Sequence, residues 1–170
     1  AKVNEYYNSL FSKGNNKFLI RDFKEINKYS YDADFTLTYN FDLRDYVQRI
    51  GKEIYLNLNM NRHLSNYRTP EDRKSEILYE YQQLLSYTTK LLIPEGYEVE
   101  YIPENQEFSN EFVTSTISYA LEGNELIYKH DIELKFLSLD LVQQKKMNQL
   151  IKEAEKAYKE VVILKNLKAS

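Results

Sequence analysis

The chain has 170 residues, which suits one domain or at most two small ones. A hydrophobic fraction of 42% and an aromatic fraction of 14% exclude a disordered chain. The net charge is −3, and the basic and acidic residues are interspersed without a basic stripe, so we expect no nucleic-acid partner. No apolar run approaches the ~20 residues of a transmembrane helix. The absence of cysteine excludes disulfides, thiol nucleophiles and cysteine-ligated metals.

The first 16 residues are predicted to form an amphipathic helix. Apolar side chains recur there at helical spacing, and Gly14 ends the pattern. We expect this helix to pack on a sheet or to link to an upstream domain. The chain starts at Ala1 rather than at methionine, so we expect it to be part of a longer protein.

Three segments follow in the first third of the chain. Residues 18–26 predict a weak strand with broken alternation. Residues 34–43 alternate apolar and polar side chains without a miss, which is typical of a half-buried strand. Residues 46–51 predict a helical turn, and residues 54–60 predict another strand.

Residues 61–74 form the longest candidate loop, and they are polar and rich in turn formers. Thr69 followed by Pro70 predicts a capped helical turn. Two interpretations stay open, a functional loop and a flexible connection.

The middle of the chain predicts short antiparallel strands. The alternation of Ile77, Tyr79 and Tyr81 predicts one of them. Strands over 85–93 and 97–102 flank a β-turn with Pro94 at its second position and Gly96 at its fourth. Strands over 112–121 and 126–136 flank the Gly123-Asn124 pair, which predicts a hairpin with a type II′ turn.

The C-terminal part predicts one long amphipathic helix over 138–159, capped by Ser138 or by Asp140 with Gln143. A last strand is expected over 161–164 and a frayed tail over 166–170. The whole pattern predicts a mainly β fold. We expect a single antiparallel β-sandwich domain over 17–165, with the N-terminal helix and the C-terminal helix packed on it.

The residue types and spacings of the chain match no catalytic signature. His63 lies in the polar loop and is expected to be exposed, whereas His130 lies on the apolar face of a strand and is expected to be a core or rim residue. Neither has the spacing of a metal ligand. Glu98 and Glu100 share the solvent face of a strand, so they are not predicted to act as a catalytic pair.

Two acidic pairs, Asp32 with Asp34 and Glu104 with Glu107, match no calcium-loop pattern. We therefore expect no catalytic, cofactor-binding or metal-binding residue in this chain. An independent enzyme would need a pocket that combines His63 or His130 with a carboxylate and a serine.

Tyrosine is unusually common, with 16 residues. One interpretation places the rings in the core with their hydroxyl groups at its margin. The other is a stacking platform for a sugar or a peptide, which would require a coplanar, exposed row of tyrosines.

Three motifs are distinctive when they are taken together: Tyr46-Val47-x-x-x-Gly51-x-x-Ile54-Tyr55-Leu56-Asn57, Leu92-Ile93-Pro94-Glu95-Gly96-Tyr97-x-Val99-x-x-Ile102-Pro103 and Phe108-Ser109-Asn110-x-Phe112. With them the chain resembles one family, the C-terminal β-domain of transglutaminase-like proteins of Bacteroidota. The resemblance covers about residues 33–165, including the helix after Ser138 and the strand at 161–164.

The resemblance implies an accessory domain that follows a transglutaminase-like or papain-like core. The catalytic Cys, His and Asp of the family belong to that core, so none of them is carried over to this chain. The implied partner is the upstream catalytic core of the same polypeptide. The implied location is periplasmic, secreted or associated with the cell envelope. A carbohydrate- or peptide-binding module is the alternative function.

Overall fold

A computed structural model describes Glu5 and residues 18–168 of the chain. The helix predicted within residues 1–16 lies outside the described residues, apart from Glu5. Two compact units are present, Ala1–Tyr46 and Val47–Ser170, whereas the sequence predicted one domain over 17–165. The difference follows from strand pairing, because the two strands of the first unit form a sheet of their own.

The first unit contains an antiparallel hairpin in its described part. β1 (Phe18–Ile26) pairs with β2 (Thr36–Leu43), close to the predicted boundaries. The register shifts between Ile20 and Phe23, which accounts for the broken alternation of β1.

The second unit contains two four-stranded sheets. The long sheet has the order β6–β10–β9–β8, with β6 (Gln83–Leu92), β8 (Gln106–Ser109), β9 (Val113–Glu122) and β10 (Glu125–Leu134). The small sheet has the order β3–β4–β12–β7, with β3 (Gln48–Ile50), β4 (Glu53–Leu56), β7 (Tyr97–Tyr101) and β12 (Val162–Asn166). In addition, β5 (Ile77–Leu78) pairs with β11 (Ser138–Leu139). Every pairing is antiparallel, which confirms the predicted mainly β, antiparallel fold.

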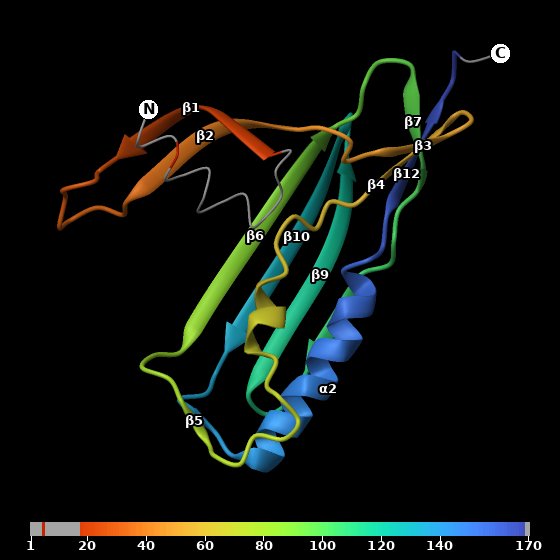
Figure 1. The fold of residues 1–170 in the computed structure, drawn as a ribbon. Helices are drawn as coiled ribbons and strands as arrows, with labels where there is room; N and C mark the ends of the chain where they lie inside the picture. The colour runs from red at the N-terminus through yellow and green to blue at the C-terminus, as the bar shows by residue number, and fades with distance from the viewer. Residues whose placement is uncertain (1–4, 6–17, 169–170) are drawn as a thin grey trace. The chain divides into compact units, whose positions relative to one another are not determined.

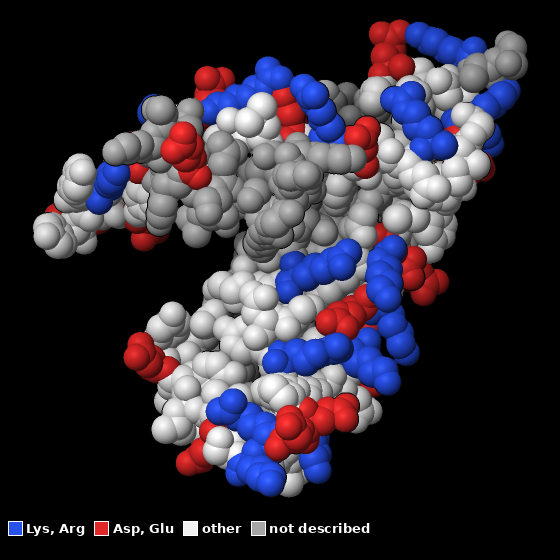
Figure 2. Space-filling model, viewed as in Figure 1, with Lys and Arg blue, Asp and Glu red and all other residues white. Residues whose placement is uncertain are grey.

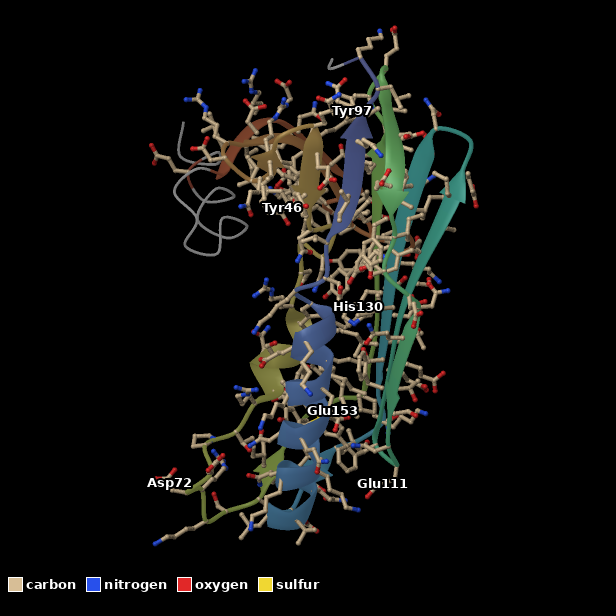
Figure 3. The ribbon with its side chains drawn as sticks, turned by 90° about the vertical axis from the view of Figure 1, so that its right-hand side faces the viewer. Tyr46, Asp72, Tyr97, Glu111, His130 and Glu153 are labelled. Carbon is tan, nitrogen blue, oxygen red and sulfur yellow. The ribbon has the colours of Figure 1, made fainter. Side chains whose placement is uncertain are left out.

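Helix α2 (Leu141–Ala157) and the small sheet lie one after the other on the same face of the long sheet (Figures 1 and 3). The second layer of the predicted sandwich is therefore shared between a sheet and a helix. Every second residue of β10 is buried between the layers: Leu126, Tyr128, His130, Ile132 and Leu134. From the other layer come the buried Met147, Leu150, Ile151, Ala154, Val162 and Leu164.

The start of α2 follows from its cap. The Asp140 carboxylate accepts hydrogen bonds from the backbone N–H groups of Val142 and Gln143, each at 2.8 Å. The Gln143 side chain accepts the Asp140 N–H at 2.9 Å, which completes a capping box. The sequence left Ser138 and Asp140 as alternatives, and the structure selects Asp140 because Ser138 lies in β11.

The turn after β6 differs from the prediction by one position. The Tyr97 N–H donates to the Pro94 carbonyl at 3.1 Å, so Gly96 is the third residue of the turn rather than the fourth. Its φ of +85° is what that position of a type II turn requires. The turn also joins the two sheets, because β6 pairs with β10 while β7 pairs with β12.

The hairpin at Gly123 is confirmed. β9 and β10 pair over ten residues each, and Gly123 has a φ of +62°. Asn124 is not among the described residues with positive φ, so only the first central position of the turn is left-handed. This is the requirement of a type II′ turn.

The helical turn predicted at 46–51 is wrong. This segment contains β3, and left-handed backbone at Asp45 and Gly51 brackets the strand. The strand predicted at 54–60 ends at Leu56, because the Asn57 and Asn59 side chains accept the N–H groups two residues on.

Two further boundaries differ from the prediction. The strand predicted from Ile77 to Tyr81 stops at Leu78, since its pairing partner β11 has only two residues. β12 runs on to Asn166, and the Leu167 N–H donates to the Gly96 carbonyl at 2.8 Å. The expected tail is therefore hydrogen-bonded up to this point.

Candidate functional site

The long loop predicted at 61–74 is an ordered element that packs on α2. It contains a short 3₁₀ helix, η1 (His63–Tyr67), whose Leu64 side chain is fully buried. The helical turn predicted to start at Thr69 is absent, and the Arg73 N–H closes a simple turn onto the Pro70 carbonyl. The interpretation as a flexible connection is thus not supported.

Two amide side chains of α2 hold this loop. Asn148 accepts the Thr69 N–H at 2.9 Å and donates to the Thr69 carbonyl at 2.8 Å, as a neighbouring strand would. Gln144, one helical turn earlier, donates to the carbonyls of Ser75 at 3.0 Å and Leu139 at 2.9 Å. The sequence separation of 79 between Thr69 and Asn148 shows that this is a tertiary contact.

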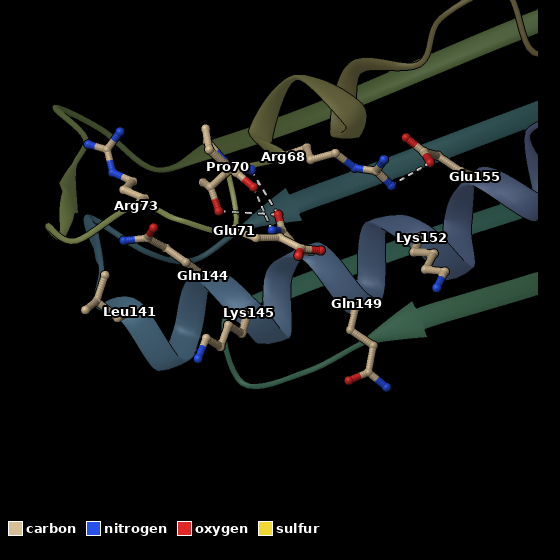
Figure 4. Close-up of a pocket in the computed structure, with 12 residues that line it drawn as sticks. Arg68, Pro70, Glu71, Arg73, Leu141, Gln144, Lys145, Gln149, Lys152 and Glu155 are labelled. Atoms are coloured by element: carbon tan, nitrogen blue, oxygen red, sulfur yellow. Dashed lines mark hydrogen bonds and ion pairs between the residues drawn. The ribbon is translucent and has the colours of Figure 1, made fainter.

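A groove of about 990 Å³ lies between the loop and α2 (Figure 4). The loop supplies Arg68, Thr69, Pro70, Glu71 and Arg73. The helix supplies Leu141, Gln144, Lys145, Asn148, Gln149, Lys152 and Glu155. No aromatic side chain lines the groove, so its chemistry is that of amides and charges.

The groove is basic overall, with four cationic and two anionic side chains. Arg68 and Glu155 neutralise one another across it in an ion pair of 2.7 Å. Lys145 and Lys152 are exposed and have no hydrogen-bond or ion-pair partner among the described residues. Figure 2 shows Lys and Arg side chains gathered over the α2 part of the surface, with acidic residues between them.

A second arrangement, inside the core, has the residue types of a hydrolase. Ser115 Oγ lies 3.0 Å from His130 Nε2, and both side chains are fully buried. His130 Nδ1 has no hydrogen-bond partner in the described part of the chain, so no carboxylate orients the ring. Burial lowers the pKa of His130 from 6.5 to about 4, which keeps the imidazole neutral. The arrangement is therefore a buried structural pair, and His130 is a core residue as predicted.

Aromatic rings surround this pair. His130 contacts Tyr158 with ring centroids 5.4 Å apart and Tyr128 at 6.5 Å, and Tyr119 follows at 5.3 Å from Tyr128. Burial raises the pKa of Tyr119 to about 12 and raises those of Tyr128 and Tyr158 further. The Ser115 hydroxyl partly opposes this rise at Tyr158, although the phenol makes no hydrogen bond of regular geometry within the described residues.

The tyrosines nearest the margin of the core do not form a platform. Tyr67, Tyr79 and Tyr87 are half-buried, and the Tyr67 and Tyr79 rings are tilted by 39°. His63 is also half-buried, with ring centroids 5.8 Å from Tyr67 and 6.3 Å from Tyr87. The prediction of an exposed His63 is wrong, because η1 turns its ring towards β6.

The acidic pairs considered in the sequence do not come together in one site. Glu98 and Glu100 are exposed, and Glu100 pairs with Lys165 at 3.1 Å. Asp32 and Asp34 lie in the exposed β1–β2 connection, and the pair Glu104 and Glu107 is exposed in the second unit. Within the described residues, no group of three or more His, Cys, Asp or Glu side chains could hold a metal ion. No described helix is long and apolar enough to cross a membrane.

Sequence reasoning did not identify the groove. The available signal was the pair Gln144 and Asn148, two amides one helical turn apart beside the apolar stripe of α2. Their partners lie in a loop of irregular backbone, which periodicity does not predict.

Comparisons with known proteins give two findings. The model of a family described as "Domain of Unknown Function with solved-structure structure (DUF3858)" matches residues 52–164. A crystal structure described as a "putative protease" from Parabacteroides distasonis ATCC 8503 matches 58% of the chain at 17% identity and a TM-score of 0.49. The match spans 20% of that protein's chain. No protein with a curated description matches.

Proposed function

We propose that this chain, which belongs to the DUF3858 family, is a non-catalytic accessory domain of a larger exported protein. Its partner is an upstream transglutaminase-like or cysteine-protease-like catalytic core of the same polypeptide. The domain supports that core or shapes its substrate cleft. We place the protein in the periplasm, at the cell envelope or outside the cell of a member of the Bacteroidota.

The observation that carries the proposal is the burial of the Ser115–His130 pair. A catalytic serine must reach its substrate, and its histidine must accept the serine proton during the reaction. Here both side chains are inaccessible, and the lowered pKa of His130 leaves it a poor proton acceptor. The groove lies elsewhere and contains neither a histidine nor a serine.

The test compares the longer protein with a version that lacks this chain. We expect deletion to reduce turnover of an amide substrate by the catalytic core or to raise its KM, and the separated chain to restore activity when added back. Unchanged kinetics after deletion, with the core still folded, would contradict an accessory role.

A peptide-binding module is the second candidate, and the groove beside α2 favours it. Its walls offer amides and free cations, which suit a polypeptide better than a sugar ring. A carbohydrate platform has less support, since the tilted, half-buried tyrosines offer no flat row. Calorimetry with peptidoglycan fragments and peptides separates these possibilities.

A further inference from the structure

We propose that the groove between residues 68–73 and α2 binds an extended, acidic polypeptide segment. This inference rests on the proposed accessory role in one respect, since it names the chemistry of the partner that the domain holds.

The charge of the groove opposes that of the chain. Four basic and two acidic side chains line it, whereas the whole chain has a net charge of −3. Lys145 and Lys152 have no partner in the described residues, and Arg73 uses only its Nε, which donates to the Ser75 carbonyl. Three cationic groups are therefore available to carboxylates without breaking an existing ion pair.

The walls of the groove are held before any partner arrives. The Thr69 backbone is fixed by Asn148, and the Ser75 carbonyl is fixed by Gln144. The Arg68–Glu155 ion pair ties the other end of the loop to the helix. Because these contacts already order the loop, binding does not include the entropic cost of ordering it.

The spacing of the free lysines suits an extended peptide. Lys145 and Lys152 are seven residues apart on α2, which corresponds to about 10.5 Å along the helix axis. Gln149 lies between them, and Figure 4 shows all three projecting from one side of the helix. In a polyproline II segment, residues three apart share a face and are separated by about 9 Å. Acidic residues at every third position therefore match the two lysines, with Gln149 free to bond the peptide backbone.

The same lining argues against a nucleic acid. Single strands bind through aromatic stacking combined with dense positive charge, and no aromatic side chain lines this groove. A polypeptide with separated carboxylates needs no stacking surface, and it needs only the few separated cations that this groove offers.

The experiment is fluorescence anisotropy with a labelled 12-residue peptide that has Glu at every third position and Pro, Ala and Ser between. A matched peptide with Gln in place of Glu is the ligand control. Lys145→Gln combined with Lys152→Gln is the test variant. The combination of Lys52→Gln and Lys90→Gln is the protein control, because it changes the net charge equally and neither residue lines the groove.

We expect saturable binding of the Glu peptide that weakens at high salt. The test variant should raise the Kd of the Glu peptide by roughly three- to tenfold, since each exposed ion pair contributes modestly to binding. The control variant should change this Kd by less than about twofold. Equal binding of the Gln peptide, equal loss in both variants, or tighter binding of an oligonucleotide of the same length would overturn the proposal. These outcomes are independent of whether the isolated chain hydrolyses a substrate, which bears on the accessory role alone.

Discussion

Ser115 Oγ and His130 Nε2 lie 3.0 Å apart in the core, as diagonal neighbours on the paired strands β9 and β10. The residue types are those of a hydrolase, but the environment is that of a structural pair. The consequence of burial is measurable as a dependence of stability on pH.

His130 should make the protein less stable in mild acid. Its pKa is about 4 in the folded state against 6.5 when exposed, so the unfolded state binds the proton first as the pH falls. The stabilisation is present above pH 6.5 and is lost towards pH 4, by up to about 3 kcal/mol. Urea unfolding at several pH values should show a smaller loss for His130→Gln than for the wild type. A His130 resonance titrating near 6.5 in the folded protein would contradict this.

Asn148→Ala should destabilise the loop at residues 68–75. The substitution leaves the N–H and the carbonyl of the buried Thr69 without their partner, which costs about 1–3 kcal/mol. Gln149→Ala is the matched control, an exposed amide at the next position of α2. Hydrogen exchange should show faster exchange of the loop amides in the first variant and no change in the second. Equal stability of the two variants would refute the role given to Asn148.

Removal of the helix cap should weaken α2. Asp140→Ala deletes the acceptor for the Val142 and Gln143 N–H groups, with an expected loss of about 1 kcal/mol in the free energy of unfolding. Asp72→Ala, in the exposed turn of the loop, should change that free energy by less than about 0.5 kcal/mol. Thermal unfolding followed by circular dichroism compares them, and a larger effect of Asp72→Ala would count against the capping box.

The turn between the two sheets should depend on the backbone of Gly96. Its φ of +85° disfavours any side chain, and Gly96→Ala should cost about 1 kcal/mol in unfolding free energy. A Cβ would also lie 3.1 Å from the flexible end of the Lys168 side chain, which can move away. Gly96→Asn should cost less, because asparagine tolerates left-handed backbone. The reverse order in denaturant unfolding would argue against a type II turn.

Local patterns predicted much of the fold because local physics decides it. The alternation along β10, the Gly123 turn and the capping box at Asp140 each depend on neighbouring residues alone. The link between β6 and β7 was predicted as a turn, but which strands pair beyond it depends on distant β10 and β12. A turn sequence contains no information on that choice.

The sequence patterns do not predict the candidate groove, for a similar reason. Its walls come from residues 68–73 and from a helix about 70–80 positions later, and the contact between Thr69 and Asn148 forms only in the folded chain. The negative search for a catalytic site, by contrast, used residue types and spacings that are visible in the sequence. Only the contact of His130 with Ser115 needed the structure.

The most direct test of the central claim is the rate at which the purified chain hydrolyses activated ester and peptide amide substrates, measured beside a folded Ser115→Ala variant. We expect no rate above the uncatalysed background for either protein. A rate in the wild type that Ser115→Ala abolishes, with circular dichroism unchanged, would contradict it.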